Sequence, residues 1–377
     1  MRGSPAAELV FTTLLTQGPL SRVAVSARTG LSSAAVTKAV RPLLGEGFLV
    51  ELTGDHTGDR IGRPAVPLQV NADRALFVGV KLMVDDAVGV VVDLRAGVRA
   101  ARRVALPSAD VGPAVEAVGE LAGELLDGRS DIHRLGLAVS GDIDRAAGVV
   151  RYSPFLGWHS VPLARLVEAR TGLPTVLEND VRALTVAEEW FGAGVGAATF
   201  AVVTVGTGIG CGLVANGGVL SGAHGVAGEI GHLPIERDGP RCHCGNRGCV
   251  EAIASERAIT EAAAAATGIA GLTQARAVEL ARDGEHPAVR AVFARAGRAI
   301  GLALAAVANL VGPERIVISG EGLAAYDLFE DEMRAAFAAQ SFGAAARCEL
   351  IVRPLPFEEW ARGAAAVAIS DFIRPLR

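Results

Sequence analysis

The hydrophobic pattern at the start of the chain predicts three short helices followed by a strand. Between Ala6 and Thr16, apolar residues recur every three or four positions, as on one face of a helix. A second helix is expected from Arg22 to Arg28, because Ser21 is a good N-cap and Gly30 a good stop. A third is expected from Ser32 or Ser33 to about Leu44, and residues 48–50 have the composition of a strand.

This order of elements is typical of a winged helix-turn-helix, which we expect over residues 1–73. In such modules the later helix lies in the major groove of DNA, and its first residues face the base edges. The glycine-rich stretch from Gly54 to Arg63 is expected to form the wing. The candidate DNA contacts on the third helix and the wing are Ser33, Thr37, Lys38, Arg41, Arg60 and Arg63. The alternative is a three-helix packing module whose charges are merely solvated.

After residue 73 the pattern changes to a long alternation of strands and helices. The expected strands are Ala75–Val84, Ala87–Asp93, Leu135–Val139, Thr199–Val205, Ile209–Ala215 and Arg315–Ile318, and the expected helices include Val115–Leu126, Asp180–Trp190 and Glu358–Phe372. This alternation predicts a layered α/β body over residues 74–377. We expect two lobes, one of about residues 74–195 with the C-terminal helix and one of about residues 196–355.

Composition and charge agree with a globular chain that carries a DNA-binding module. Half the residues are apolar and a fifth are charged. No stretch offers the roughly 18 uninterrupted apolar residues of a membrane span, so we expect a cytoplasmic protein without a membrane partner. Residues 1–75 carry eight Lys/Arg against six Asp/Glu, whereas the remainder carries 28 against 35. A mildly basic head on an acidic body suits a DNA-binding module fused to another domain.

Three of the five cysteines, Cys242, Cys244 and Cys249, crowd into eight residues. In a cytoplasmic chain such crowding indicates a metal site rather than disulfides. With His232 they make a Cys₃His set, which is typical of a structural Zn²⁺ site with no open position. His243 is an alternative nitrogen ligand, although its position between two proposed ligands makes simultaneous coordination awkward. Three free surface cysteines are the other interpretation.

Five short motifs are spread over nearly the whole chain. They are Gly62-Arg63-Pro64, Leu177-Glu178-Asn179-Asp180, Val205 to Gly210, Glu229-Ile230-Gly231-His232, and Cys242-His243-Cys244-Gly245 with Gly248-Cys249. Together they resemble the ROK family of repressors, open reading frames and kinases, as its hinge, sugar-site loop, second phosphate loop, E-x-G-H motif and cysteine signature. The resemblance implies the two-lobed actin-like fold of sugar kinases (ribonuclease H-like). It also implies similarity to the family's xylose- and N-acetylglucosamine-type repressors.

The resemblance further implies a sugar site. Its residues would be Gly141, Asn179, Asp180, Glu229, His232 and Glu251, with His232 also a zinc ligand. Carboxylates accept hydrogen bonds from neighbouring hydroxyls, and a buried site built that way rejects isomers that leave groups unpaired. From the residues alone, Asp180 could instead simply cap the helix it begins, and Glu251 could be a solvated helix charge.

A kinase of this family would need an Asp-x-Gly-Gly-Thr turn near the start of the body. Its glycines admit nucleotide phosphates, and its acid and hydroxyl support Mg²⁺. Here Lys81 stands in place of the Asp, and Met83 and Val84 stand in place of the glycines. Glu321 replaces a glycine of the adenosine-side turn, and Phe155 replaces an Asn. We therefore expect no kinase activity and no catalytic residue, so that Asp180, the base of a kinase, keeps only a binding role.

The sequence thus predicts a sugar-responsive DNA-binding regulator, with structural Zn²⁺, that represses carbohydrate-utilisation genes. Its expected partners are an operator in double-stranded DNA and a sugar or sugar phosphate. A homodimer or homotetramer is expected because helix-turn-helix heads read paired half-sites. Two alternatives remain open: an ATP-dependent sugar kinase with an added DNA-binding head, and a DNA-binding protein that answers to a protein partner instead of a sugar.

Overall fold

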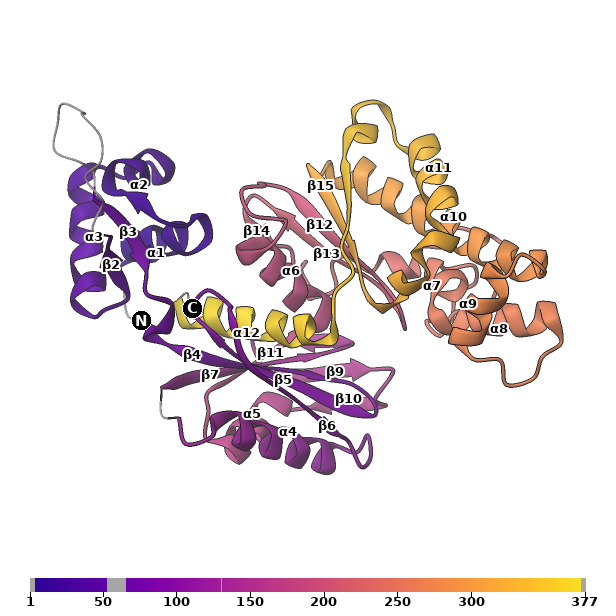
Figure 1. Ribbon diagram of the computed structural model, residues 1–377, viewed down its shortest axis with the longest axis horizontal. Helices are drawn as coiled ribbons and strands as arrows, with labels where there is room; N and C mark the ends of the chain where they lie inside the picture. The colour runs from indigo at the N-terminus through magenta and orange to yellow at the C-terminus, as the bar shows by residue number, and fades with distance from the viewer. Residues whose placement is uncertain (1–3, 53–65, 130, 374–377) are drawn as a thin grey trace. The chain divides into compact units, whose positions relative to one another are not determined.

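Residues 4–52, 66–129 and 131–373 are described by the computed structural model, in which the chain divides into two units (Figure 1). Unit 1 comprises Met1–Gly196 and Phe357–Arg377, so that the last helix returns to the first unit. Unit 2 comprises Ala197–Pro356.

The first part of unit 1, residues 1–73, contains the three predicted helices. We call this part the head. They are α1 (Pro5–Gln17), α2 (Arg22–Thr29) and α3 (Ser33–Gly45). The side chains of Ser4, Ser21 and Ser32 cap their N-termini, each by accepting the backbone N–H three residues on. A small antiparallel sheet of β1 (Leu20–Ser21), β3 (Pro67–Val70) and β2 (Leu49–Glu51) completes the head. The expected wing tip with Arg60 and Arg63, and the motif Gly62-Arg63-Pro64, lie outside the described residues.

The main sheet of unit 1 has the strand order β11-β7-β4-β5-β6. Its strands are β4 (Leu76–Leu82), β5 (Asp86–Asp93), β6 (Val98–Ala105), β7 (Ile132–Val139) and β11 (Thr175–Asn179). The two predicted strands β4 and β5 pair antiparallel, whereas β7 runs parallel to both β4 and β11. Because β4, β7 and β11 are parallel, their carboxyl ends meet at one edge of the sheet.

Helices cover both faces of this sheet. The first pair is α4 (Val111–Leu126) and α5 (Leu163–Thr171), and the second is α6 (Asp180–Phe191) and α12 (Phe357–Ile373). Val78 and Val80 of β4 share a core with α4 and α5, whereas Gly79 between them faces α12. A Cβ atom at Gly79 would collide with the Ala361 carbonyl oxygen of α12. The helix therefore lies unusually close to the strand.

Several elements of unit 1 were not predicted. They are β6, β11, α5, the short segment η1 (Ala72–Arg74) and a second antiparallel sheet of β8 (Asp142–Asp144), β9 (Val149–Ser153) and β10 (Trp158–Val161). Helix α4 also begins at Val111, four positions before the expected Val115, with Asp110 at its N-cap position.

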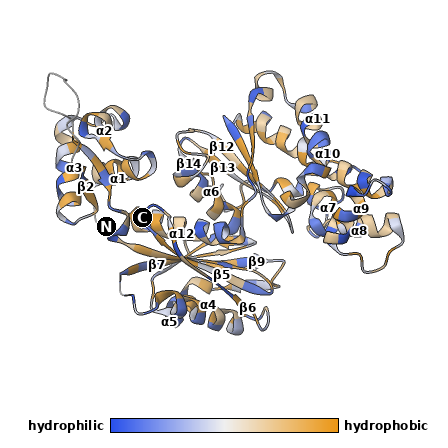
Figure 2. Cartoon of the chain, viewed as in Figure 1, coloured by the Kyte–Doolittle hydropathy of each residue, from blue (hydrophilic) through white to orange (hydrophobic). Residues whose placement is uncertain are grey.

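Unit 2 is built on a second five-stranded sheet of order β14-β13-β12-β15-β16. The strands are β12 (Phe200–Val205), β13 (Ile209–Ala215), β14 (Gly218–Val219), β15 (Arg315–Ser319) and β16 (Glu349–Val352). The helices are α7 (Val250–Ala254), α8 (Glu256–Thr267), α9 (Gln274–Arg282), α10 (Pro287–Val311) and α11 (Glu330–Gln340), with short segments η2 (Ile230–His232), η3 (Glu321–Leu328) and η4 (Gly343–Arg347). Strands β5 and β12, which lie in the interior of the two sheets, are hydrophobic along most of their length (Figure 2).

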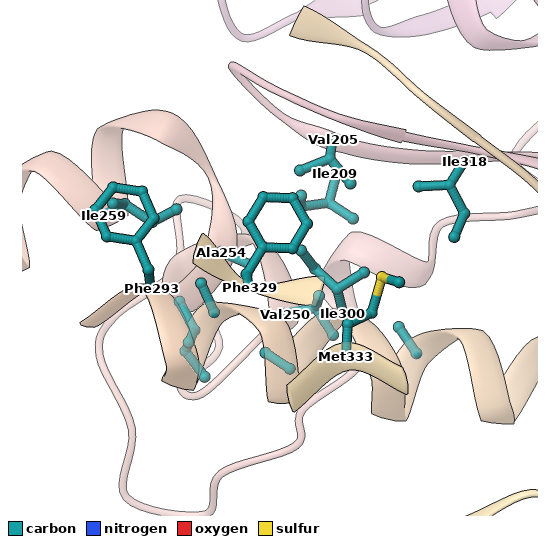
Figure 3. Close-up of a cluster of buried hydrophobic side chains, with 14 of the residues drawn as sticks. Val205, Ile209, Val250, Ala254, Ile259, Phe293, Ile300, Ile318, Phe329 and Met333 are labelled. Carbon is teal, nitrogen blue, oxygen red and sulfur yellow. The ribbon is translucent and has the colours of Figure 1, made fainter. Parts of the chain in front are cut away.

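The core of unit 2 lies around the long helix α10. Phe293 and Ile300 of α10 pack with Phe329, Met333 and Ile318 from the surrounding elements (Figure 3). Within the described residues, α10 is the one helix that is long and apolar enough to cross a membrane. Its apolar side chains are those of a core helix, since most of them are buried within this unit.

Candidate functional site

Three polar side chains meet at the carboxyl edge of the main sheet of unit 1. Lys81 stands near the end of β4, Ser140 directly follows β7, and Asp180 is the first residue of α6, directly after β11. The Lys81 ammonium donates to Asp180 Oδ2 in a salt bridge and lies 3.1 Å from Ser140 Oγ. Ser140 Oγ donates to the same Asp180 oxygen at 2.5 Å. The parallel strands thus bring together three residues that are far apart in sequence.

The electrostatics of this cluster keep Asp180 ionised. The side chains of Lys81 and Asp180 are only 7% and 10% exposed. Burial alone would raise the pKa of the Asp180 carboxyl, but the charge and hydrogen bond of Lys81, with the bonds from Ser140 and the Val181 amide, lower that pKa below its usual value. A carboxylate held in this way is a poor acceptor for another proton.

Gly141 and Asn179, two of the expected sugar ligands, lie beside this cluster. Asn179 Oδ1 accepts the backbone N–H groups of Val181 and Arg182, so Asn179 and not Asp180 is the N-cap of α6. The interpretation of Asp180 as merely the helix cap is therefore wrong. Asn179 Nδ2 donates to the Gly141 carbonyl at 3.0 Å. Gly141 has φ +132°, and a Cβ atom there would collide with the Tyr152 carbonyl oxygen.

The three remaining expected sugar ligands lie in unit 2. Glu229 Oε2 is 4.0 Å from His232 Nε2, at the end of segment η2. Glu251 on α7 is mostly buried: its Oε2 accepts the Ile209 backbone N–H at 3.0 Å, and its Oε1 lies 3.3 Å from His243 Nε2. The interpretation of Glu251 as a solvated charge is therefore wrong. The contact with His243 was not predicted, and no spacing rule would have found it.

The predicted metal ligands form a compact cluster in unit 2. One donor atom from each of His232, Cys242, Cys244 and Cys249 can lie within 4.8 Å of all the others. Cys244 Sγ and Cys249 Sγ are 3.8 Å apart, and Cys242 Sγ is 3.6 Å from His232 Nδ1. A tetrahedral ion with bonds of about 2.3 Å to sulfur separates its ligand atoms by about 3.7 Å. The cluster therefore fits a metal ion of this kind.

A second donor group overlaps the first. His232, Cys242, His243 and Glu251 also lie close enough to share an ion. In both groups His232 presents Nδ1 toward Cys242. Its Nε2 is then left on the side of Glu229.

The exposed face of α3 carries four of the expected DNA contacts. Ser33, Thr37, Lys38 and Arg41 are exposed, whereas Val36 and Val40 on the other face are buried. With Ala34 and Pro42, these four line a shallow depression of about 560 Å³ on the surface of the head.

The fold and these sites can be compared with known proteins. The ROK family model matches residues 77–371 of this chain. The chain belongs to the ROK family. It is 30% identical over 346 residues to a putative xylose repressor of Caldicellulosiruptor sp. (strain Rt8B.4), covering 86% of this chain and 85% of that protein.

Two solved structures differ in how much of the chain they match. A ROK family transcriptional regulator, described as a homologue of the Escherichia coli MLC protein, superposes with a TM-score of 0.82 at 27% identity and covers 97% of this chain and 96% of its own. A ROK family glucokinase from Streptomyces griseus, in complex with glucose and AMPPNP, superposes with a TM-score of 0.68 at 30% identity. The match covers 78% of this chain and 99% of the glucokinase. The α/β fold of this chain is thus shared by ROK regulators and sugar kinases.

Proposed function

We propose that this ROK protein is a sugar-responsive transcription repressor of carbohydrate-utilisation genes, with a non-catalytic sugar-kinase-like body as its sensor. The observation that carries the proposal is the difference in coverage. The regulator structure matches 97% of this chain. The kinase structure matches only 78% of this chain, although 99% of the kinase itself is included in the match. The family match begins at residue 77, which supports the head as the part that the kinase lacks.

The loss of kinase activity is supported by the cluster around Asp180. A sugar kinase needs a carboxylate that accepts the proton of the attacking hydroxyl. Here the Lys81 ammonium and the Ser140 hydroxyl occupy Asp180 Oδ2. Met83 and Val84 bring side chains to the positions where glycines would admit phosphates. Asp180 then serves ligand binding or structure rather than proton transfer.

The DNA-binding role is assigned to residues 1–73 as a winged helix-turn-helix. Its support is the exposed polar face of α3 and the small antiparallel sheet of β1, β3 and β2. Ser33, Thr37 and Lys38 are placed to reach base edges or phosphates, and Arg41 to reach the backbone. Arg60 and Arg63 are proposed as wing contacts on sequence grounds alone.

Residues 74–377 are assigned as the sensor domain, with a sugar or sugar phosphate as its ligand. Its proposed ligands are Gly141, Asn179 and Asp180 of unit 1 and Glu229, His232 and Glu251 of unit 2. In support, the Glu251 carboxylate is oriented by two contacts, and the His232 ring carries its Nε2 on the side of Glu229. Oriented carboxylates and imidazoles discriminate between isomers of a polyol.

The metal site is proposed to hold structural Zn²⁺ on His232, Cys242, Cys244 and Cys249, since this set closes a tetrahedron. The ion would join segment η2, which carries His232, to the loop before α7. It would also fix the His232 ring through Nδ1. We further propose that the protein acts in the cytoplasm as a homodimer or homotetramer, because paired heads read paired half-sites.

Operator binding with and without a panel of sugars and sugar phosphates tests the proposal. Upstream DNA of the chain's own gene and of neighbouring carbohydrate genes serves as the probe. We expect at least one sugar to change the operator affinity by about tenfold, since differential affinity for two states is what shifts an equilibrium. Binding that no sugar alters would contradict the sensor role, and ATP turnover on a hexose panel would support the kinase alternative.

A further inference from the structure

The turn between β12 and β13 presents hydrogen-bond donors of the kind that hold anions. Gly206, Thr207 and Gly208 form this tight turn, and Gly206 N–H donates to the Gly208 carbonyl at 3.1 Å. The backbone N–H and the hydroxyl of Thr207 both point toward the same acceptor atom. Glycine-rich turns with convergent donors are general binding sites for phosphate and carboxylate groups.

A carboxylate of the chain itself occupies these donors. Glu321 Oε1 accepts the Thr207 backbone N–H at 2.9 Å and lies 3.2 Å from Thr207 Oγ1. Glu321 follows β15, which runs parallel to β12, so the ends of the two strands bring the two residues together. The contact spans 114 positions of sequence.

The backbone on both sides is shaped to admit this carboxylate. A Cβ atom at Gly206 would collide with the Glu321 carboxylate, which therefore lies directly against the glycine. Gly320 has φ +104°, and a Cβ atom there would collide with the Val205 carbonyl oxygen; one at Gly322 would lie 2.9 Å from that oxygen. Three glycines thus let the Glu321 turn press against the Thr207 turn.

A second carboxyl group adds negative charge near the turn. Glu256, the first residue of α8, donates its backbone N–H to the Gly206 carbonyl at 2.9 Å. Burial raises the pKa of the Glu256 carboxyl, and the nearby charge of Glu321 raises it further. An incoming phosphate would have to displace one carboxylate and approach another.

We propose that Glu321 is an internal anion that takes the place of a phosphate ligand at the Thr207 turn, and so determines that unit 2 excludes nucleotide phosphates. The inference deepens the proposed non-catalytic function and rests on it. It differs from simple charge repulsion, because an occupied donor stays closed even when the occupant is neutral. It also differs from a purely structural contact, because vacating the turn opens a site.

Calorimetric titration of the full chain with inorganic tripolyphosphate, and separately with ATP, distinguishes these cases. The variants are Glu321→Gly, which vacates the turn, and Glu321→Gln, whose amide oxygen still accepts from Thr207. Glu314→Ala is the matched control, since Glu314 also accepts backbone N–H groups in unit 2, from Ala198 and Thr199. We expect Glu321→Gly to bind tripolyphosphate at least about tenfold more tightly than wild type, with Glu321→Gln and Glu314→Ala within about threefold of wild type.

Two results would overturn the inference. One is wild-type chain that binds tripolyphosphate as tightly as Glu321→Gly. The other is an equal gain in Glu321→Gly and Glu321→Gln, which would indicate charge repulsion alone. Thermal unfolding checks that each variant is folded, and Glu321→Ala replaces Glu321→Gly if the latter is not. The sugar effect on operator binding is measured in parallel, so that failure of the proposed function is seen there and not in the titration.

Discussion

Lys81 and Asp180 form a buried ion pair that joins the end of strand β4 to the start of helix α6. Removing one partner of a buried pair leaves the other charge uncompensated, which costs about 3–5 kcal/mol. We expect Lys81→Met to lower the free energy of unfolding of unit 1 by about 3 kcal/mol. All three tryptophans, Trp158, Trp190 and Trp360, lie in unit 1, so their fluorescence in urea follows this unit alone.

The control for this prediction is the double variant Lys81→Met/Asp180→Asn, which removes both charges. It should be more stable than Lys81→Met, because the buried charge is gone. If the loss of unfolding free energy in the double variant equals the sum of the losses in Lys81→Met and Asp180→Asn, the two residues do not interact.

The same pair predicts how acid affects unit 1. The pKa of Asp180 is lower in the folded protein than in the unfolded chain, so the carboxylate stabilises the fold above about pH 4. This stabilisation is lost as the pH falls through the folded-state pKa. In Lys81→Met burial is no longer opposed by the ammonium, so the folded-state pKa of Asp180 rises and the deficit in unfolding free energy relative to wild type should shrink as the pH falls. Urea unfolding followed by tryptophan fluorescence at several pH values from 7 to 3 measures this deficit, and a deficit that does not change with pH would contradict the prediction.

The close contact between α12 and the sheet predicts opposite effects for two glycines. A Cβ atom at Gly136 of β7 would collide with the Ala364 carbonyl oxygen of α12, whereas nothing lies within 4 Å of one at Gly123 of α4. We expect Gly136→Ala to destabilise unit 1 by about 1–3 kcal/mol through overpacking. Gly123→Ala should instead stabilise it by about 0.5–1 kcal/mol, because alanine favours a helix interior. Fluorescence-detected urea unfolding measures both, and the same sign for both would contradict the packing argument.

These contacts also show what local sequence patterns can and cannot predict. Helical spacing and serine caps were enough for α1 to α3, because those signals lie within a few residues of each other. Strand β6 was missed because an edge strand with Arg99, Arg102 and Arg103 lacks the apolar run of a buried strand. Strand β11 was missed because its five residues lead directly into α6.

The candidate sites divide in the same way. The cysteine spacing predicted the metal cluster, since its ligands are local. The sequence predicts that Lys81 departs from a kinase motif, but its partner Asp180 lies 99 positions away and is brought near only by the parallel strands. The contact between Glu321 and Thr207 depends on strand pairing in the same manner.

The metal cluster predicts different outcomes for two neighbouring histidines. His232→Gln removes a ligand of the proposed zinc set, whereas His243→Gln removes a residue that belongs only to the overlapping group. By plasma mass spectrometry we expect about one zinc per chain in wild type and in His243→Gln, and a large loss in His232→Gln. Cys244→Ser removes another ligand of the proposed zinc set. Cys348→Ser is its control, because Cys348 lies outside both groups. Zinc lost from His243→Gln but retained in Cys244→Ser would assign the site to the other group, because Cys244 belongs only to the proposed zinc set.

The exposed face of α3 predicts a change in the salt dependence of DNA binding. If Lys38 contacts a phosphate, Lys38→Ala should reduce the slope of log K against log salt by about 1 on a duplex of random sequence. Arg257→Ala on α8 removes one positive charge elsewhere and should leave the slope unchanged. Electrophoretic mobility shifts at several salt concentrations give the slopes. Equal slopes for wild type and Lys38→Ala would remove Lys38 from the interface.

The final prediction concerns the contact between the head and helix α12. The Phe372 ring lies 6.0 Å from Phe48 of the head and 5.4 Å from Phe77 of β4, measured between ring centroids. At the other end of α12, the Trp360 ring lies 5.5 Å from Lys81 Nζ. One helix therefore contacts both the ion pair and the head, so a ligand that disturbs Asp180 would bias this helix.

We expect Phe372→Ala to lower the free energy of unfolding of unit 1 by about 2–3 kcal/mol, below the usual cost of a buried Phe because the ring is only half-buried. If α12 carries the signal, the ratio of operator affinities with and without sugar should fall toward one in this variant. Phe342, a residue of unit 2 that is 86% exposed, provides the control, and Phe342→Ala should retain the wild-type ratio. A folded Phe372→Ala protein with an unchanged ratio would exclude this contact as the route from the ligand to the head.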